Sequence, residues 1–335
     1  MNYRTMGRTG LNVSEVGFGC GNIGGLMIRG SHEEQIEAVE LALNLGFNYF
    51  DTAPSYGDGR SEANLGKVLS ELDPNIVLAS KVGLSLEQLD DIPDAIERSV
   101  EASLNRLQRD YVDVLQLHTK IALRRDSSEW PRALSIQDVL GENGVADSFD
   151  SLRKQGKARF IGFTGMGETI ALHQMIESKR FDVVQTYFNL LNPSAGYQVS
   201  DGFSGYNFKQ LINKASEGGM GVAAIRVMAG GAVGGDGSRK GYASPLVSGP
   251  MVPGGEYEKD LTRSSRLDFL VQGEIRSIPQ AALKFVLMHS GVSIALVGFS
   301  NLSQIKEAAE TTKLNSIPQS HIIKLQDLRS QSIWY

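Results

Sequence analysis

The sequence predicts a (β/α)8 TIM barrel, because strand-like and helix-like segments alternate eight times along a chain of 335 residues. The strand-like segments are apolar on both faces, as parallel strands covered by helices must be. No linker or change of composition divides the chain, so we expect a single barrel domain over residues 1–335.

The eight pairs follow one another in regular order. The expected strands are residues 16–18, 47–50, 76–79, 111–117, 160–163, 183–187, 221–228 and 294–299. The expected helices begin after Ser31 and then cover 60–70, 94–107, 148–155, a segment ending at 179, 208–217, 279–290 and 301–311. The first of these helices opens with the capping box Ser31-His32-Glu33-Glu34, after which apolar residues recur at helical spacing.

Two further elements lie outside the eight pairs. Residues 3–6 and 12–15, joined around Gly7 and Gly10, are expected to form a β-hairpin over the barrel floor. Residues 319–329 are expected to form an extra C-terminal helix.

Two long insertions, 120–145 and 229–276, follow the fourth and seventh strands. Both therefore lie at the C-terminal face of the barrel, where barrel enzymes place their active sites. Long loops at that face are either binding loops and lids or mobile surface insertions, and the sequence leaves both interpretations open.

The run GFGCGNIGG at residues 17–25 contains G-x-G-x-x-G between Gly19 and Gly24. In a Rossmann fold this fingerprint opens a helix at once, because the helix N-terminus binds the pyrophosphate. Here the expected helix begins about ten residues later, at Ser31. The favoured interpretation is the first strand-end loop of a barrel, in which Gly19 and Gly21 let the backbone approach a ligand closely. A turn without a role remains the alternative.

Polar side chains follow three successive expected strands. Asp51 and Tyr56 come after the second strand, Lys81 after the third and His118 after the fourth. Taken singly, each is a weak signal, since aspartates cap, lysines are solvated and lone histidines are usually structural. In a barrel the strand ends converge on one mouth, so we expect these four side chains to meet over one cavity.

The four residue types point to acid–base chemistry at a carbonyl or hydroxyl carbon. A free tyrosine has a pKa of about 10, and a lysine ammonium beside Tyr56 is expected to lower this value by favouring the phenolate. Asp51 supplies the counter-charge that a buried Lys81 needs. His118 can hydrogen-bond a substrate oxygen and orient it. Because none of these groups donates hydride, redox chemistry at this site requires a cofactor.

The bulk composition argues against several other classes of protein. With 33 Lys and Arg against 38 Asp and Glu, the net charge of −5 disfavours nucleic acid or an anionic membrane as partner. The single cysteine, Cys20, cannot form an internal disulfide. No run is apolar enough to span a bilayer and the N-terminus has no signal-peptide core, so a cytoplasmic protein is expected. The five histidines are scattered without an H-x-H pair, so no metal site is expected.

At residues 46–57, GFNYFDTAPSYG, the sequence resembles the first signature of the aldo-keto reductase family. Lys81 in LASKVG and His118 in LQLH complete the family's catalytic tetrad with Asp51 and Tyr56. The resemblance covers essentially the whole chain. It implies a nicotinamide cofactor bound across the barrel mouth, direct hydride transfer between the cofactor and a substrate carbon, Tyr56 as general acid–base and His118 as the group that orients the oxygen.

The resemblance carries over less completely to the cofactor-binding residues. Gln185 matches the glutamine expected to bind the nicotinamide carboxamide. Thr164-Gly165 stand where the family commonly has Ser-Asn. Arg226 stands where an aromatic side chain often stacks on the nicotinamide, and its guanidinium plane can also stack.

The adenosine end departs furthest from the family pattern. NADPH-dependent relatives usually have an Arg or Lys for the 2′-phosphate after strand eight. This chain has Gly298, Ser300 and Gln304 there, followed by Glu307, which matches the acid that contacts adenine. Because a bidentate arginine for phosphate is missing, we expect NAD(P)(H) as cofactor with NAD(H) slightly favoured. Asn301 and Gln304 also have a purely structural interpretation, as a capping pair.

The stretches IGFTG and VGFSNLSQ resemble the branch that contains aldose and galactose dehydrogenases. This implies NAD-dependent oxidation of a sugar, with NADPH-dependent reduction of aldehydes or ketones as the alternative. A cofactor-sensing regulatory subunit, similar to the potassium-channel β-subunits, is the alternative from another class. Trp130 and Trp334 are candidate walls of the substrate pocket. The sequence does not determine the oligomeric state or the substrate.

Overall fold

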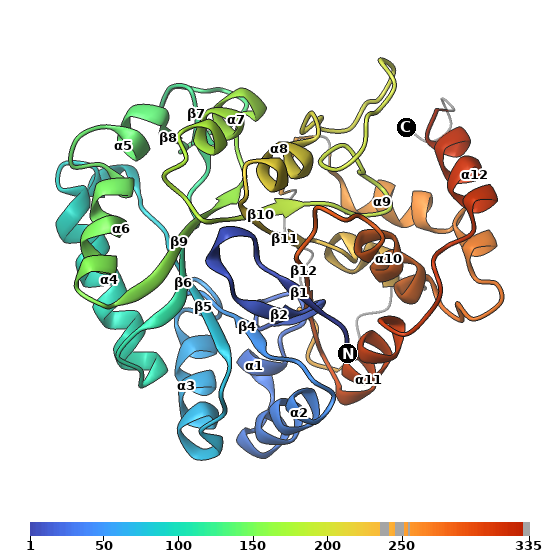
Figure 1. Ribbon diagram of the computed structural model, residues 1–335, viewed down its shortest axis with the longest axis horizontal. Helices are drawn as coiled ribbons and strands as arrows, with labels where there is room; N and C mark the ends of the chain where they lie inside the picture. The colour runs from blue at the N-terminus through green and yellow to red at the C-terminus, as the bar shows by residue number, and fades with distance from the viewer. Residues whose placement is uncertain (235–240, 245–250, 254, 331–335) are drawn as a thin grey trace.

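Eight parallel strands form a closed barrel in a computed structural model that describes residues 1–234, 241–244, 251–253 and 255–330 (Figure 1). In spatial order the strands are β3 (Val16–Gly19), β4 (Tyr49–Asp51), β5 (Val77–Val82), β6 (Val112–Leu117), β9 (Ala158–Gly165), β10 (Val183–Tyr187), β11 (Gly221–Ile225) and β12 (Ile294–Gly298). The barrel closes where β12 pairs with β3, so the predicted barrel is confirmed.

One helix follows each barrel strand and covers the outside of the barrel (Figure 1). These helices are α2 (His32–Asn44), α3 (Arg60–Leu72), α4 (Ile92–Leu107), α6 (Val145–Lys154), α7 (Thr169–Glu177), α8 (Leu211–Glu217), α10 (Ile278–Leu287) and α11 (Leu302–Thr311). The predicted capping box is present at the start of α2, where Ser31 and Glu34 each bond the other's backbone. The short helix α1 (Leu26–Arg29), which precedes α2, is not anticipated by the sequence pattern.

The predicted hairpin lies across the barrel opening that faces the viewer in Figure 1. Strands β1 (Tyr3–Thr5) and β2 (Asn12–Ser14) pair antiparallel, and the 3-10 turn η1 (Gly7–Thr9) joins them. Gly7 has φ +49, and a Cβ there would lie 2.3 Å from the backbone nitrogen of Gly221. Only glycine therefore allows the hairpin to press this closely on the first residue of β11.

Both long insertions contain regular structure of their own. The segment 120–145 forms two short parallel strands, β7 (Ile121–Ala122) and β8 (Leu134–Ser135), followed by α5 (Ile136–Leu140). The segment 229–276 contains η3 (Ala229–Gly234), α9 (Tyr257–Ser264) and η4 (Asp268–Leu270). The extra C-terminal helix α12 covers Gln319–Ser330. Among the described residues, no helix has the length and apolar character needed to cross a membrane.

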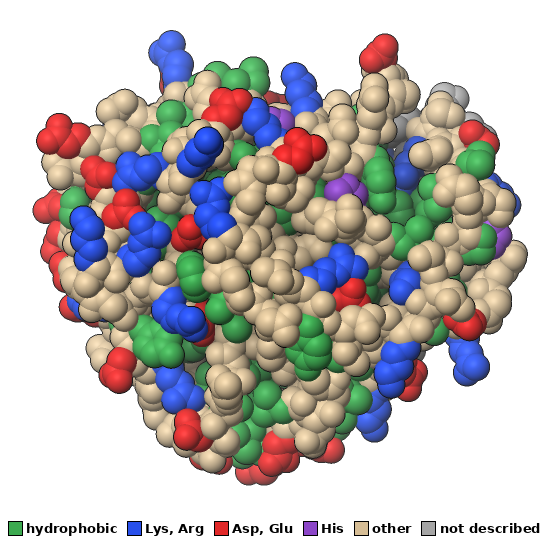
Figure 2. Space-filling model, in the orientation of Figure 1, with side chains coloured by type: hydrophobic (Ala, Val, Ile, Leu, Met, Phe, Trp, Pro, Cys, Tyr) green, Lys and Arg blue, Asp and Glu red, His purple; other side chains and the backbone are tan. Residues whose placement is uncertain are grey.

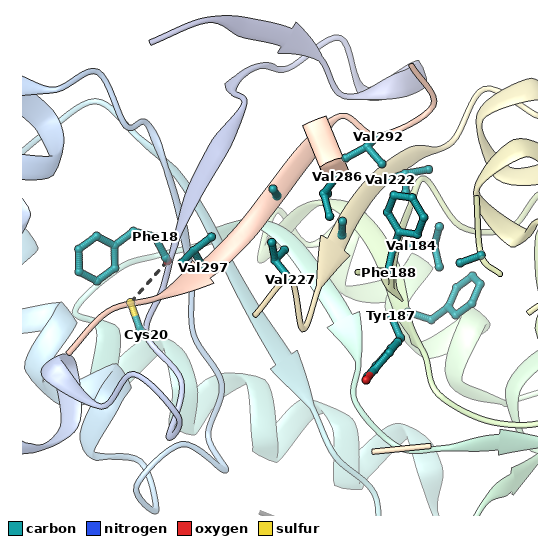
Figure 3. Packing of buried hydrophobic residues seen from close by; sticks show 14 of the residues in the cluster. Phe18, Cys20, Val184, Tyr187, Phe188, Val222, Val227, Val286, Val292 and Val297 are labelled. Carbon is teal, nitrogen blue, oxygen red and sulfur yellow. Dashed lines mark hydrogen bonds between the residues drawn. The ribbon is translucent and has the colours of Figure 1, made fainter. Parts of the chain in front are cut away.

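Two apolar layers stabilise the barrel. The larger one fills the space between strands and helices, and Figure 3 shows part of it, with Val184 and Val222 from the strands near Val286 from α10. The smaller one fills the lower barrel interior under the hairpin and includes Tyr49 and Val114. On the face with the hairpin, basic and acidic side chains are interspersed (Figure 2). Several buried polar residues, Asp51, Lys81 and Gln185 among them, lie near the carboxyl ends of the strands, where the site described next is found.

Candidate active site

The four residues of the predicted catalytic group lie together at the carboxyl end of the barrel. Asp51 is the last residue of β4, Lys81 lies one residue before the end of β5, and His118 directly follows β6. Tyr56 lies in the turn between β4 and α3. Lys81 is 1% exposed and Asp51 is 4% exposed, so the charged pair is enclosed within the barrel.

Three hydrogen bonds hold the charged pair. The Nζ of Lys81 donates to Asp51 Oδ2 at 2.6 Å and to the carbonyl of Thr52 at 2.8 Å. The Nε2 of Gln185, from the opposite side of the barrel, donates to Asp51 Oδ1 at 2.6 Å. Burial by itself would lower the pKa of Lys81, but the charges of Asp51 and Tyr56 outweigh it and the pKa is raised, so the ammonium stays charged.

Tyr56 is packed between the other members of the group. The Lys81 Nζ lies 4.8 Å from the centre of its ring, and the His118 ring meets it edge-on at 5.7 Å between centroids. Burial raises the pKa of Tyr56, and the Lys81 charge opposes this without reversing it. The expectation that lysine lowers the pKa below its ordinary value is therefore not met, because the tyrosine loses more hydration than the sequence reveals.

His118 is held in its neutral form. Burial and the nearby Lys81 charge lower its pKa to about 3. The hydroxyl of Ser55 lies 3.4 Å from its Nδ1. An imidazole that stays neutral at physiological pH can orient an oxygen by hydrogen bonding, and the neighbouring hydroxyl of Tyr56 has a proton that it could exchange.

The glycine-rich segment 19–25 supports both Tyr56 and the neighbouring strand end. A Cβ at Gly21 would lie 3.5 Å from the Tyr56 ring, and one at Gly24 would lie 2.4 Å from the backbone nitrogen of Phe299. Asn22 accepts a hydrogen bond from the backbone N–H of Gly57 at 3.0 Å, which fixes the turn that carries Tyr56. The sequence analysis missed Asn22, although an asparagine inside a glycine run is a turn signal.

A cavity of about 470 Å³ lies between the ends of β11 and β12. None of the four residues is among its lining residues, but Arg226 is, and the charge of Arg226 acts on Tyr56. Its volume falls within the range of cofactor and ligand sites. Five of the predicted cofactor-binding residues line it, namely Arg226, Gly298, Ser300, Gln304 and Glu307. Sequence reasoning missed other lining residues, among them Ile23, Gly24, Met228, Gly231 and Ser303.

At one end of the cavity the N-terminus of α11 is capped by its own side chains. Asn301 accepts from the backbone N–H of Gln304 at 3.1 Å, as the predicted capping pair requires. The Oε1 of Gln304 accepts from the Ser300 backbone N–H at 2.8 Å and from its hydroxyl at 3.1 Å. Glu307, one turn further along, accepts a hydrogen bond from the Ser277 hydroxyl. The polar groups at this end are therefore neutral or acidic.

At the other end of the cavity Arg226 has a strained backbone. Its φ is +57, which is uncommon for a residue other than glycine. Its carbonyl accepts from Asn189 Nδ2 at 2.9 Å and from the Ala229 N–H at 2.8 Å, and these bonds hold the strained conformation. This turn ends β11 at Ile225, three residues before the predicted end of the strand. A Cβ at Gly230 would lie 2.7 Å from the Arg226 Nη1, so the guanidinium lies over a glycine.

The other predicted cofactor residues lie between the cavity and the charged pair. The hydroxyl of Thr164 is buried and has no hydrogen-bond partner among the described groups. A Cβ at Gly165 would lie 2.9 Å from the Gln185 carbonyl oxygen, so this position has no room for a side chain. Gly19 ends β3 and packs against the backbone of β12. The amide nitrogen of Gln185, which was predicted to bind the nicotinamide carboxamide, donates a hydrogen bond to Asp51 in this structure.

The structure does not place Trp130, a predicted substrate residue, in the lining of the cavity. Trp130 is 1% exposed and packs edge-on against Tyr206, with centroids 5.2 Å apart. It belongs to the larger apolar layer, together with Ile121 and Leu134 from the same segment, because burial of its large ring removes much apolar surface from water. Trp334 lies outside the described residues.

The residues present fit a nicotinamide dinucleotide. The cavity has Arg226, whose charge acts on Tyr56, at one end and the capped N-terminus of α11 at the other. Outside the cavity lining, the unpartnered hydroxyl of Thr164 lies on β9 at the position paired with Gln185. A helix N-terminus attracts phosphate and the free hydroxyl can bond a carboxamide. Fold and site together define a barrel oxidoreductase that depends on NAD(P).

The comparison with known proteins agrees with this class. The chain belongs to the aldo/keto reductase family, whose model matches residues 15–329. L-galactose dehydrogenase from Arabidopsis thaliana is 29% identical over 326 residues, which cover 94% of this chain and 89% of the relative. D-threo-aldose 1-dehydrogenase from a Pseudomonas species is 24% identical over 347 residues, covering 96% and 95% of the two chains. The structure of aldo-keto reductase AKR11C1 from Bacillus halodurans superposes with a TM-score of 0.70 at 25% identity, covering 97% of this chain and 96% of that one.

Proposed function

We propose that this protein oxidises the anomeric carbon of a sugar with NAD, and that Tyr56 is the general acid–base. The observation that carries the proposal is the enclosed group of Asp51, Lys81 and Tyr56 together with a cavity that contains Glu307 and lacks an arginine at the adenosine end. The relatives named as sugar dehydrogenases support the choice of substrate class.

In this mechanism each residue acts on the proton or on the oxygen. His118, neutral at the pH of the reaction, hydrogen-bonds the substrate hydroxyl and directs it at Tyr56. Tyr56 accepts the hydroxyl proton as the carbon is oxidised, and returns a proton in the reverse direction. Lys81 stabilises the phenolate, and Asp51 keeps Lys81 charged and in place. When bound, the nicotinamide would supply the hydride acceptor or donor. Thr164 and Arg226 would hold its end of the dinucleotide, and the residues at the start of α11 would hold the adenosine end.

The preference for NAD(H) follows from the charges in the cavity. In NAD-binding sites an acid can accept from the ribose 2′-hydroxyl, whereas a 2′-phosphate needs a cation. Ser300, Gln304 and Glu307 provide an acid and neutral groups at this end. Among the described lining residues Arg226 is the only Lys or Arg, and it lies at the other end of the cavity.

Ser300→Arg is expected to tighten NADPH binding by about tenfold or more while leaving NADH nearly unchanged, since a charged hydrogen bond to phosphate is gained. Fluorescence titrations with NADH and NADPH side by side measure the effect. In the unmodified protein NADH should bind at least as tightly as NADPH. Ser316→Arg adds the same charge on the exposed segment after α11 and serves as the control. If the unmodified protein bound NADPH at least tenfold more tightly than NADH, the preference would be disproved.

Arg226→Met is expected to weaken the binding of NADH and of NADPH by the same factor, about tenfold, because both cofactors contain the diphosphate. The ratio of the two affinities should stay constant, in contrast to the Ser300 variant. Competition with ADP distinguishes the two possible roles of Arg226. If Arg226 binds the diphosphate, the variant should also bind ADP more weakly. If Arg226 stacks on the nicotinamide, the affinity of the variant for ADP should be unchanged. Arg98→Met, on the exposed surface of α4, is the matched control. Unchanged affinity for all three nucleotides would remove Arg226 from the cofactor site.

The substrate class is tested by measuring NAD-dependent oxidation of a panel of aldoses against NADPH-dependent reduction of aldehydes and ketones. Sugar oxidation with a higher kcat/KM than carbonyl reduction supports the proposal. Faster carbonyl reduction with NADPH would replace it with the alternative, and absence of turnover with either panel would favour a cofactor-binding regulatory role.

A further inference from the structure

Two buried polar side chains in the barrel interior, on strands that carry or adjoin the predicted catalytic group, have unpaired atoms. Gln116 and Tyr49 are both 0% exposed. The Nε2 and Oε1 of Gln116 and the hydroxyl of Tyr49 have no hydrogen-bond partner among the described residues. Leaving such groups unpaired in a protein interior is costly, and buried amides and hydroxyls are almost always bonded to protein or to ordered water.

Strand register places Gln116 next to the catalytic group. Gln116 on β6 pairs with Lys81 on β5 and with Gly162 on β9. A Cβ at Gly162 would lie 3.1 Å from the Cγ of Gln116, so the glutamine side chain extends over this glycine into the barrel interior. In a (β/α)8 barrel, alternate strands contribute to one interior layer, and the bond between Asp51 on β4 and Gln185 on β10 marks such a layer. Gln116, on β6, lies on the strand between these two in the alternate set.

Tyr49 approaches the same layer from below. It is two residues before Asp51 on β4, so it faces the same side about 7 Å further down the strand. Burial raises the pKa of its hydroxyl, and the charges of Asp51 and Asp113 add to this effect. Among the described residues, the other titratable groups that act on this charged pair or on Tyr56 are Cys20, His118 and Arg226, besides Tyr56 and Lys81 themselves.

We propose that Tyr49 and Gln116 bind an ordered water molecule beneath the Asp51–Lys81 pair, and that through it they act as positioning residues for the proton transfer at Tyr56. Three unpaired atoms are enough for one water, which typically makes two to four hydrogen bonds in a protein interior. Its remaining hydrogen bond is directed at the charged pair and favours the ionised form of Asp51. Lys81 then stays charged and stabilises the phenolate of Tyr56.

Tyr49→Phe and Gln116→Met each remove the water's partners while keeping the side-chain shape. Each variant is expected to lower kcat by about fivefold to tenfold with KM unchanged, as for the loss of one hydrogen bond. The pH profile of oxidation should move to higher pH by about half a unit, because the phenolate loses support. The kcat of the double variant should be no lower than that of either single variant, because each single substitution already removes the same water.

The control is Thr186→Val. The hydroxyl of Thr186 is also buried and unpaired, but Thr186 lies on the outer face of β10, since Gln185 points inward. This variant should keep the kcat and pH profile of the unmodified protein.

A crystal structure that resolves ordered water tests whether Tyr49 and Gln116 bind a water molecule. This test does not depend on enzyme activity. We expect one water within hydrogen-bonding distance of Tyr49 Oη and the Gln116 amide. Direct pairing of these atoms with protein groups, no density beside them, or single variants with unaltered kcat and pH profile would each overturn the proposal. It rests on the proposed function only for the kinetic readout. If the unmodified protein turns over no substrate, the proposed function fails while the density still decides the water site.

Discussion

Tyr56→Phe is expected to lower kcat by about a thousandfold, within the range that a positioned acid–base group contributes. The variant keeps the aromatic ring that packs on Lys81 and His118 and loses only the hydroxyl that is proposed to exchange the proton. Cofactor affinity should stay within about twofold, because the hydroxyl acts on the substrate and not on the nucleotide. Steady-state kinetics in both directions, together with NADH titration, measure both effects.

Tyr111→Phe is the matched control for this prediction. Tyr111 is 46% exposed on the outside of the barrel, so its hydroxyl has no part in the site and turnover should be unchanged. A Tyr56→Phe variant that retained turnover close to that of the control would show that another group transfers the proton, and the assignment of Tyr56 would have to be abandoned.

Lys81→Met is expected to lower kcat for oxidation by about a hundredfold, because Tyr56 loses the positive charge that stabilises its phenolate. The Lys81 charge opposes the rise in the pKa of Tyr56 that burial causes. Without it the pKa of Tyr56 rises further, and less phenolate is present at any given pH. The pH profile of oxidation should therefore rise only at higher pH than in the unmodified protein, while the protonated form needed for reduction persists over a wider range.

The same substitution leaves Asp51 as a buried charge without its ammonium partner, which destabilises the fold. Thermal unfolding separates this effect from catalysis. Lys81→Met combined with Asp51→Asn removes the unpaired charge and should recover much of the stability without recovering activity. Lys67→Met, on the exposed side of α3, controls for the loss of a lysine. Recovery of activity along with stability would mean that Lys81 serves the fold and not the proton transfer.

The barrel and the positions of its catalytic group were predictable from local pattern. Helical spacing, capping residues such as Ser31 and Asn301, and doubly apolar strands depend on residues close together in the chain. Once eight such pairs are present, closure brings the strand ends to one mouth, so Asp51, Lys81 and His118 meet there. The sequence alone therefore determined which of these side chains meet and at which end of the barrel.

Only the tertiary structure decided how those residues are held. The bond between Asp51 and Gln185 joins residues 134 positions apart and exists only because the barrel is closed. The pKa of Tyr56 depends on how much water the surrounding loops exclude, so the opposing effects of burial and of Lys81 could not be ranked from sequence. The left-handed turn at Arg226 likewise depends on Asn189 from the neighbouring strand segment. Local patterns are set by neighbours in the chain, whereas burial, charge and strain are set by partners that only folding brings together.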